Sequence, residues 1–309
     1  MVISAVQTQN IFGIQAGNAS KMLPDTLLPG RIDNSESIFT SVDTEISLEN
    51  EKNIDIIAHR GYSVDAPENT IAAFITAAEN GYNTIECDIE WSKDSVPVLL
   101  HDSTINRTAR KQNGDKLLFP KKCSSLTYNE LLEYDFGSWC GSEYSGTKIP
   151  TFYELMDCAK EYNLRLYIEL KETKNFDINK AQILVDAVRE TGLENNVTWI
   201  SFEEDYLKMI SDLAPGARLG YLSDKKVTNK TVKTLENLKT DDNEVFLDIK
   251  SSKISEKASE MLDNAGFNFE VWGIEDTNKL DVLFSYDCKG ITTDTITNST
   301  LEEYLNLAE

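Results

Sequence analysis

The sequence predicts an α/β protein whose fold is a TIM (β/α)8 barrel, carrying an irregular N-terminal extension and an insertion after the second strand. Three observations support this fold class. Short β-branched runs alternate with amphipathic stretches eight times, which is typical of parallel strands joined by helices. The chain has 309 residues, of which 40% are hydrophobic, enough for one large barrel. The glycine-rich loop that would favour an open dinucleotide-binding sheet is missing after the first strand, where His59-Arg60-Gly61 stands instead.

The eight strands and eight helices are predicted in strict alternation. The strands are expected at 54–58, 84–91, 165–170, 196–202, 218–223, 244–249, 267–273 and 290–294. The helices are expected at 68–80, 151–163, 179–192, 205–214, 229–239, 255–266, 278–287 and 299–309. The first helix illustrates the pattern, because Ile71, Phe74, Ile75 and Ala78 share one face and Gly81 ends it.

Two segments depart from this alternation. Residues 1–50 are rich in Ser, Thr, Asn, Gln and Gly without sustained periodicity, and we interpret them as a tail, a linker, or an attachment or oligomerisation segment. The barrel domain is expected at 51–309. Within it, a hairpin-like return over 92–102 opens an insertion at about 103–150. Because a loop that follows a barrel strand lies on the catalytic face, this insertion is expected to shape the substrate site.

Charge and composition exclude several function classes. The net charge of −22, from 52 acidic and 30 basic residues, disfavours binding to nucleic acids or to anionic membranes through a broad basic face. The five cysteines show no metal-binding spacing, so they are expected to be free thiols, with a Cys123–Cys140 disulfide left open. There is no apolar run of membrane-spanning length and no visible signal peptide. The cytoplasm is therefore the default location, with an extracellular or virion-associated location as the alternative.

Ionisable residues gather at the ends of the first three predicted strands. Residues two apart on a strand point to the same face, so the acidic pair in the second strand should point into the barrel together. The same holds for the pair that ends the third strand. The residues concerned are His59, Arg60, Glu86, Asp88, His101, Glu169 and Lys171.

This constellation predicts cleavage of a phosphodiester. Three confined carboxylates require a cation, and oxygen ligands favour Mg²⁺ or Ca²⁺. A metal, an arginine and a lysine together suit a phosphate, and two histidines suit a general base and a general acid. Each pattern alone is weak: an HRG turn may simply be capped, and alternating charges often mark a solvated strand edge. Asp248 and Lys250 repeat the alternation without a histidine, and we expect them to be structural or peripheral.

The ordered motifs resemble the glycerophosphodiester phosphodiesterase family. The matching stretches are AHRG (58–61), PENT (67–70), ECDIEWSKDSVPVLLHD (86–102), IELK (168–171) and, more loosely, VWGI (271–274) and GITTD (290–294). The resemblance covers about residues 54–298. Three positions depart from the family pattern: Gly273-Ile274-Glu275 replaces Thr-Val-Asn, Thr295 replaces a proline, and Ser95 replaces a turn glycine.

The resemblance implies a TIM barrel that hydrolyses glycerophosphodiesters to an alcohol and sn-glycerol 3-phosphate with one divalent cation, Ca²⁺ or Mg²⁺. It also implies the role of each residue. His59 and His101 would be the catalytic acid/base pair, Glu86, Asp88 and Glu169 the metal ligands, Arg60 and Lys171 the phosphate-binding cations, and Glu68, Asn69 and Trp272 part of the substrate pocket.

The substrate and the partners stay open at this level. The substrate could be a small glycerophosphodiester or a glycerol-phosphate polymer such as teichoic acid, and the N-terminal extension would suit an envelope-directed or phage-borne depolymerase. A non-catalytic binding barrel is disfavoured because every expected catalytic position is intact. A glycosidase would leave His59, Arg60 and Lys171 without a role. Oligomerisation through residues 1–50 is the remaining partner hypothesis.

Overall fold

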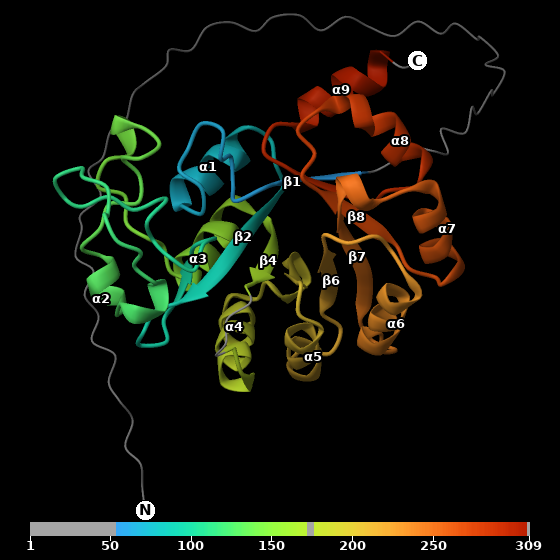
Figure 1. Ribbon diagram of the computed structural model, residues 1–309, viewed down its shortest axis with the longest axis horizontal. Coiled ribbons are helices and arrows are strands. Elements are labelled where there is room, and N and C mark those ends of the chain that lie inside the picture. The colour runs from blue at the N-terminus through green and yellow to red at the C-terminus, as the bar shows by residue number, and fades with distance from the viewer. Residues whose placement is uncertain (1–53, 172–175, 308–309) are drawn as a thin grey trace, which may run out of the picture. The chain divides into compact units, whose positions relative to one another are not determined.

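The computed structural model describes residues 54–171 and 176–307, and the predicted extension at 1–50 lies outside them. Its sheet has nine strands, and it closes because β1 pairs with both β9 and β2. All neighbouring pairs are parallel except that of β3 with β2, so the predicted eight-stranded parallel barrel is confirmed (Figure 1). The strands are β1 (Asp55–Ala58), β2 (Thr84–Trp91), β3 (Pro97–Leu99), β4 (Arg165–Leu170), β5 (Val197–Ser201), β6 (Arg218–Ser223), β7 (Glu244–Lys250), β8 (Phe269–Trp272) and β9 (Gly290–Thr293).

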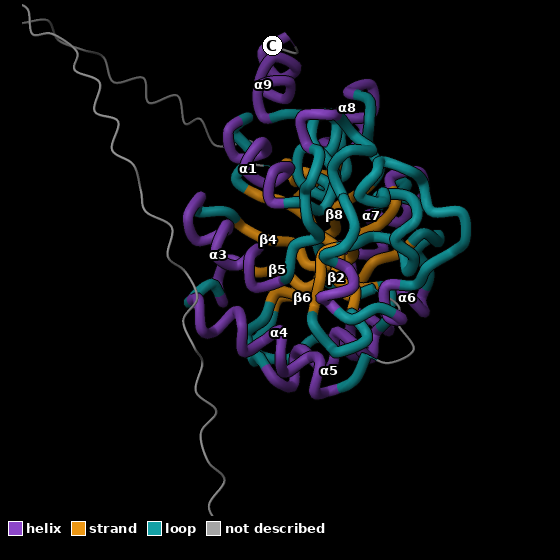
Figure 2. The backbone as a smooth tube through the Cα atoms, turned by 90° about the vertical axis from the view of Figure 1, so that its left-hand side faces the viewer, coloured by secondary structure: helices purple, strands orange, loops and turns teal. Residues whose placement is uncertain are grey.

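Helices surround the strands, as Figure 2 shows. Those of the described residues are α1 (Ile71–Glu79), α2 (Tyr128–Leu131), α3 (Phe152–Tyr162), α4 (Ile178–Thr191), α5 (Glu204–Leu213), α6 (Asn229–Leu238), α7 (Glu256–Asn264), α8 (Leu280–Ser285) and α9 (Asn298–Leu307). The first helix begins later than the expected residue 68, because the Thr70 side chain accepts from the Ala73 N–H and caps it there. Glu68 therefore lies in the turn before α1.

The barrel interior is filled by a small apolar cluster. Its buried members are Ile57, Tyr167, Ile200, Leu222 and Phe246. Gly220 on β6 leaves room for it, since a Cβ there would come within 2.6 Å of the Phe246 ring. Such packing makes the barrel a solid support rather than a pore, so side chains at the strand ends are held on a fixed rim.

The insertion has a hydrophobic core of its own. Strand β3 forms the expected hairpin with β2, and Ser95 in its turn adopts a φ of 63°, the left-handed conformation for which glycine is the usual residue. Behind the hairpin, a second buried cluster consists of Val98, Leu100, Ile105, Ala109, Cys123, Leu126, Leu131, Phe136 and Ile149. The insertion is thus a packed unit attached to the barrel rim.

Two further expectations concern cysteines and membranes. All five cysteines are free thiols, so Cys123 and Cys140 are not paired. Among the described residues, no helix combines the length and the apolar character needed to span a bilayer.

Candidate active site

Three carboxylates converge where β2 and β4 run side by side. Asp88 and Glu169 are register partners, and Glu86 precedes Asp88 by two residues on the same face of β2. One oxygen from each of Glu86, Asp88 and Glu169 lies within 4.8 Å of the others. Glu86 and Asp88 are almost completely buried, and Glu86 Oε1 has no hydrogen-bond partner. The sequence prediction that these residues meet is therefore correct geometrically.

The electrostatics of the three carboxylates fit a bound divalent cation. Burial and repulsion from Asp88 raise the pKa of Glu86 to about 8 and that of Glu169 to about 7. Burial also opposes ionisation of Asp88, but Lys171 and Arg60 hold the pKa of this carboxyl well below its usual range. An all-oxygen cluster in which crowding raises the pKa of two of the three carboxyl groups is the kind of donor set that Ca²⁺ or Mg²⁺ takes.

The two predicted phosphate-binding cations lie beside this cluster. Lys171 Nζ is 2.8 Å from both Asp88 Oδ1 and Glu169 Oε2, and Arg60 Nε is 3.3 Å from Asp88 Oδ2. The backbone N–H of Arg60 also donates to Glu86 Oε2 at 2.9 Å. This contact depends on a tight turn, because Arg60 has a φ of 59° and a Cβ on Gly61 would lie 2.8 Å from Ala73.

His59 is fixed from the opposite end of the chain. Its Nδ1 lies 2.8 Å from Asp294 Oδ1, directly after β9, and the Ser63 hydroxyl donates to the same carboxylate at 3.0 Å. Burial favours the neutral ring, but the bond to Asp294 and the charge of Glu86 together raise the pKa of His59 to about 9. Because Nδ1 is engaged, Nε2 is the nitrogen left for a substrate.

His101 is fixed by the insertion. Its Nδ1 lies 2.7 Å from Asp102 Oδ1, and Asp102 Oδ2 accepts from Arg107 Nε at 2.7 Å. Burial, followed by opposing effects from Asp88 and from the cations Lys171 and Arg60, lowers the pKa of His101 below its ordinary value. The two histidines thus have the same Nδ1-to-aspartate arrangement but pKa values shifted in opposite directions.

The PENT turn links these groups. Asn69 donates from Nδ2 to Asp88 Oδ2 at 2.6 Å and accepts from the Asp88 N–H at 3.1 Å, so it orients a predicted metal ligand. Glu68 accepts from Arg60 Nη1 at 2.9 Å and from Arg107 Nη2 at 2.8 Å. Glu68 and Asn69 are thereby joined to the charged network, and their predicted role in the substrate pocket stays a prediction.

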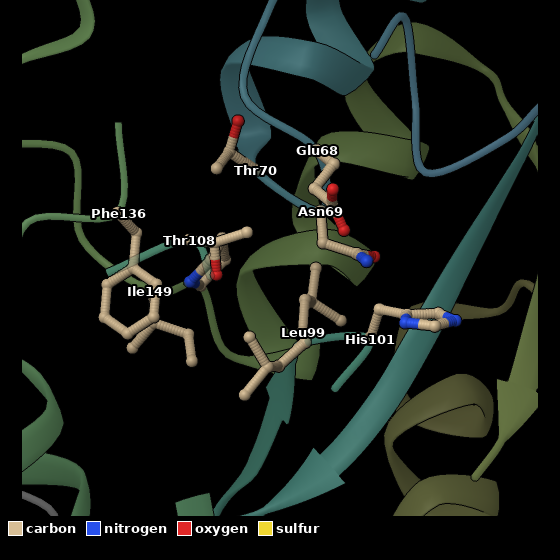
Figure 3. A pocket seen from close by; sticks show the side chains of 10 residues that line it. Glu68, Asn69, Thr70, Leu99, His101, Thr108, Phe136 and Ile149 are labelled. Atoms are coloured by element: carbon tan, nitrogen blue, oxygen red, sulfur yellow. The ribbon is translucent and has the colours of Figure 1, made fainter. Parts of the chain in front are cut away.

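The insertion fits closely against this turn. Figure 3 shows Glu68 and Asn69 beside Leu99 and His101, with Phe136 of the insertion core across a small cavity. The cavity measures about 10 Å³, at the lower limit for a single water molecule. The insertion is therefore in direct contact with the PENT turn.

Trp272 lies at the end of β8 and packs against the interior apolar cluster. Its ring makes an edge contact with Phe202 at 6.2 Å between centroids, and Lys250 Nζ lies 5.3 Å from the ring centroid. Asp248, expected to be structural or peripheral, is fully buried beneath the site, and burial together with Glu270 and Glu86 raises its pKa. It is therefore part of the interior, not of the periphery.

The residues that sequence reasoning missed are those that hold the histidines. Asp294 closes the GITTD stretch and Asp102 follows His101 directly, so both stood in motifs already recognised. Arg107 stood only in the polar part of the insertion, and no local signal pointed to it. Its partners Glu68 and Asp102 become neighbours only in the folded chain.

Known proteins resemble this chain in sequence and in fold. Residues 59–298 match the model of the glycerophosphoryl diester phosphodiesterase family. The glycerophosphodiester phosphodiesterase of Caldanaerobacter subterraneus is 34% identical over 167 residues, which are 54% of this chain and 65% of that protein. Glycerophosphodiester phosphodiesterase 1 of mouse is 37% identical over 120 residues, 38% of this chain and 34% of that protein. The matches thus span less than two thirds of each of these two relatives.

Solved structures show the same fold. A putative glycerophosphoryl diester phosphodiesterase from Silicibacter pomeroyi superposes with a TM-score of 0.74 at 19% identity, covering 84% of this chain and 95% of that one. An Oleispira antarctica phosphodiesterase, solved with the product sn-glycerol-3-phosphate, superposes with a TM-score of 0.72 at 25% identity, covering 81% and 96%.

Proposed function

The chain belongs to the glycerophosphoryl diester phosphodiesterase family, and we propose that it hydrolyses glycerophosphodiesters to an alcohol and sn-glycerol 3-phosphate. One observation carries this proposal: three carboxylates, two cations and two aspartate-held histidines meet on one rim of the barrel. The product bound to the Oleispira antarctica phosphodiesterase agrees with the same reaction class.

In this proposal Glu86, Asp88 and Glu169 hold one Ca²⁺ or Mg²⁺. The ion would stabilise negative charge on the phosphate when bound. Lys171 and Arg60 supply further positive charge at the same place and bind phosphate oxygens. The fit of the carboxylate cluster supports this role, because the pKa values of Glu86 and Glu169 are raised by crowding that a cation would relieve.

The two histidines then divide the proton transfers between them. One imidazole removes a proton from the attacking water as its oxygen bonds to phosphorus, and the other gives a proton to the alkoxide whose bond to phosphorus breaks. Asp294 and Asp102 keep both rings oriented through Nδ1. Proton transfer at Nε2 is thereby assigned to both residues.

The test is release of glycerol 3-phosphate from glycerophosphocholine by the purified chain, with Mg²⁺, with Ca²⁺ and with a chelator. We expect release with at least one ion and almost none with the chelator. Absence of release with both ions, across a panel of small glycerophosphodiesters, would reject the proposed reaction. Undiminished release in the chelator would reject the role of the metal.

A second candidate substrate is a glycerol-phosphate polymer. Its repeating units are joined by the same phosphodiester bond, so the same catalytic groups would serve. What favours it is a groove that follows the ends of β6 and β7 and is lined by Lys226, Lys230, Lys253 and Lys257.

A further inference from the structure

A groove lies between the N-terminal ends of α6 and α7. It encloses about 880 Å³ and is lined by the loops that follow β6 and β7 and by the first turns of the two helices. Four lysines line it and no acidic residue does: the lysines are Lys226, Lys230, Lys253 and Lys257. Figures 1 and 2 both place α6 and α7 next to each other outside the barrel.

The charge of this groove contrasts with the rest of the chain. Acidic residues outnumber basic ones by 52 to 30, yet the groove lining is entirely basic among its charged residues. None of the four lysines forms an ion pair with a described residue, whereas Lys171 contacts two carboxylates. A concave surface with one sign of charge concentrates ligands of the opposite sign.

The backbone adds to the same field. The first N–H groups of a helix lack acceptors within the helix and carry partial positive charge. Thr228 caps α6 by accepting from the Thr231 N–H, and Ser255 caps α7 by accepting from the Ala258 N–H. The first turns of both helices line the groove, and Lys230 and Lys257 belong to these turns.

The groove begins at the rim that carries the catalytic groups. Lys226 follows the end of β6 by three residues, and Lys253 follows the end of β7 by three. Lys250, the last residue of β7, precedes Lys253 by three residues; it is exposed, and its Nζ lies 5.3 Å from the centroid of the Trp272 ring. The Lys250 ammonium already occupies the face of the Trp272 ring, so a quaternary ammonium group of a substrate is disfavoured there.

We propose that this groove, defined by Lys226, Lys230, Lys253 and Lys257, binds the further phosphates of an oligomeric glycerol phosphate whose terminal phosphodiester lies at the catalytic cluster. The substrate class is a phosphodiester polyanion, and a substrate with one phosphate would not reach the groove. This inference rests on the proposed function for the reaction itself. It adds the substrate class.

The experiment compares the unmodified chain with a variant carrying Lys226→Gln, Lys230→Gln, Lys253→Gln and Lys257→Gln. The substrates are a synthetic glycerol phosphate tetramer and glycerophosphoglycerol, which has a single phosphodiester. We expect kcat/KM for the tetramer to fall by about tenfold or more, because the variant loses the long-range attraction between the lysines and the phosphates. For the same reason, kcat/KM for the tetramer should depend less on salt concentration. The kcat/KM for glycerophosphoglycerol should stay within about twofold, because a monoanion makes no contact with the groove.

The matched control replaces four exposed lysines elsewhere by glutamine: Lys111, Lys116, Lys122 and Lys208. It changes the net charge equally and should leave the preference for the tetramer intact. Equal loss on both substrates, no loss on either, or the same loss in the control would overturn the groove assignment. Loss of binding to phosphatidylglycerol vesicles with unchanged tetramer turnover would overturn it in favour of a membrane surface.

A binding measurement separates this proposal from the proposed reaction. Tetramer binding is titrated calorimetrically in the presence of a chelator, where no turnover is expected. Weaker binding by the groove variant than by the control variant supports the groove even if no glycerol 3-phosphate is ever released. Equal binding by the two variants rejects the groove even if hydrolysis proceeds.

Discussion

The two sides of the barrel rim use lysine in opposite ways. At the ends of β1, β2 and β4, Lys171 lies against two carboxylates that balance its charge, and its side chain is mostly buried. Beside β6 and β7, the groove lysines have no carboxylate partner among the described residues. A balanced network can hold reacting groups in place, whereas unbalanced charge attracts a ligand from solution. In the proposed function, this difference separates the chemistry from the selection of substrate.

The largest effect is expected when either histidine beside the carboxylate cluster is replaced. His59→Asn and His101→Asn should each lower kcat by about 10²- to 10⁴-fold, since each removes a proton transfer. The measurement is the rate of glycerol 3-phosphate release at saturating substrate. Binding of the glycerol phosphate tetramer by the same variants should change little, and near-normal rates in either variant would contradict the acid/base assignment.

Replacing a carboxylate comes next in expected effect. Asp88→Asn leaves Lys171 and Arg60 without their shared partner and removes one predicted metal ligand. We expect Ca²⁺ or Mg²⁺ affinity, measured by calorimetry, to fall by about 10- to 100-fold or more. Glu90→Gln on the same strand is the matched control, because Glu90 is buried but lies outside the three-carboxylate cluster. Equal affinity in both variants would remove Asp88 from the metal site.

Replacing Arg107 tests whether the insertion contributes to the charged network around the carboxylate cluster. Arg107→Gln frees Asp102 and Glu68 together, so we expect kcat to fall by about 10- to 100-fold and the pH profile of kcat to shift. Arg107→Lys should not restore the rate, because one ammonium cannot replace the fork that bridges two carboxylates. The exposed neighbour Lys111→Gln serves as control. An unchanged pH profile in Arg107→Gln would limit this residue to a structural role.

The smallest effect is expected in the hairpin that leads to His101. Ser95 has a φ of 63°, and Ser95→Gly would relieve that conformation at the cost of a more flexible unfolded chain. We expect the free energy of unfolding in urea to rise by less than about 1 kcal/mol, with activity unchanged. A loss of stability in this variant would mean that the Ser95 side chain itself stabilises the turn.

The barrel and the carboxylate cluster could be predicted because both follow from patterns within single strands. Alternation along a strand places Glu86 and Asp88 on one face, and the parallel register brings Glu169 beside them. Glu68 shows the limit of the same reasoning, because it was expected in the first helix and lies before it, where Thr70 provides the cap. Helix ends depend on one side-chain hydrogen bond, which periodicity does not report.

The contacts that orient the histidines and the basic groove depend on distant segments. His59 and Asp294 are 235 positions apart in the chain, and Arg107 meets Glu68 across 39. The groove lysines are spread over two loops and two helices, so in the sequence they read as ordinary solvated charges. The pairing of β1 with β9 brings Asp294 to His59, and the pairing of β6 with β7 brings the two groove loops together.

The ion pairs of Arg107 with Glu68 and Asp102 have a consequence for protein engineering. The insertion has its own apolar core, so it invites replacement by a loop from another barrel as a means of changing specificity. Arg107 makes such an exchange conditional. A grafted loop that lacks a guanidinium at this place would give a chimera that folds well and turns over slowly, and libraries built on this scaffold should hold that one position constant.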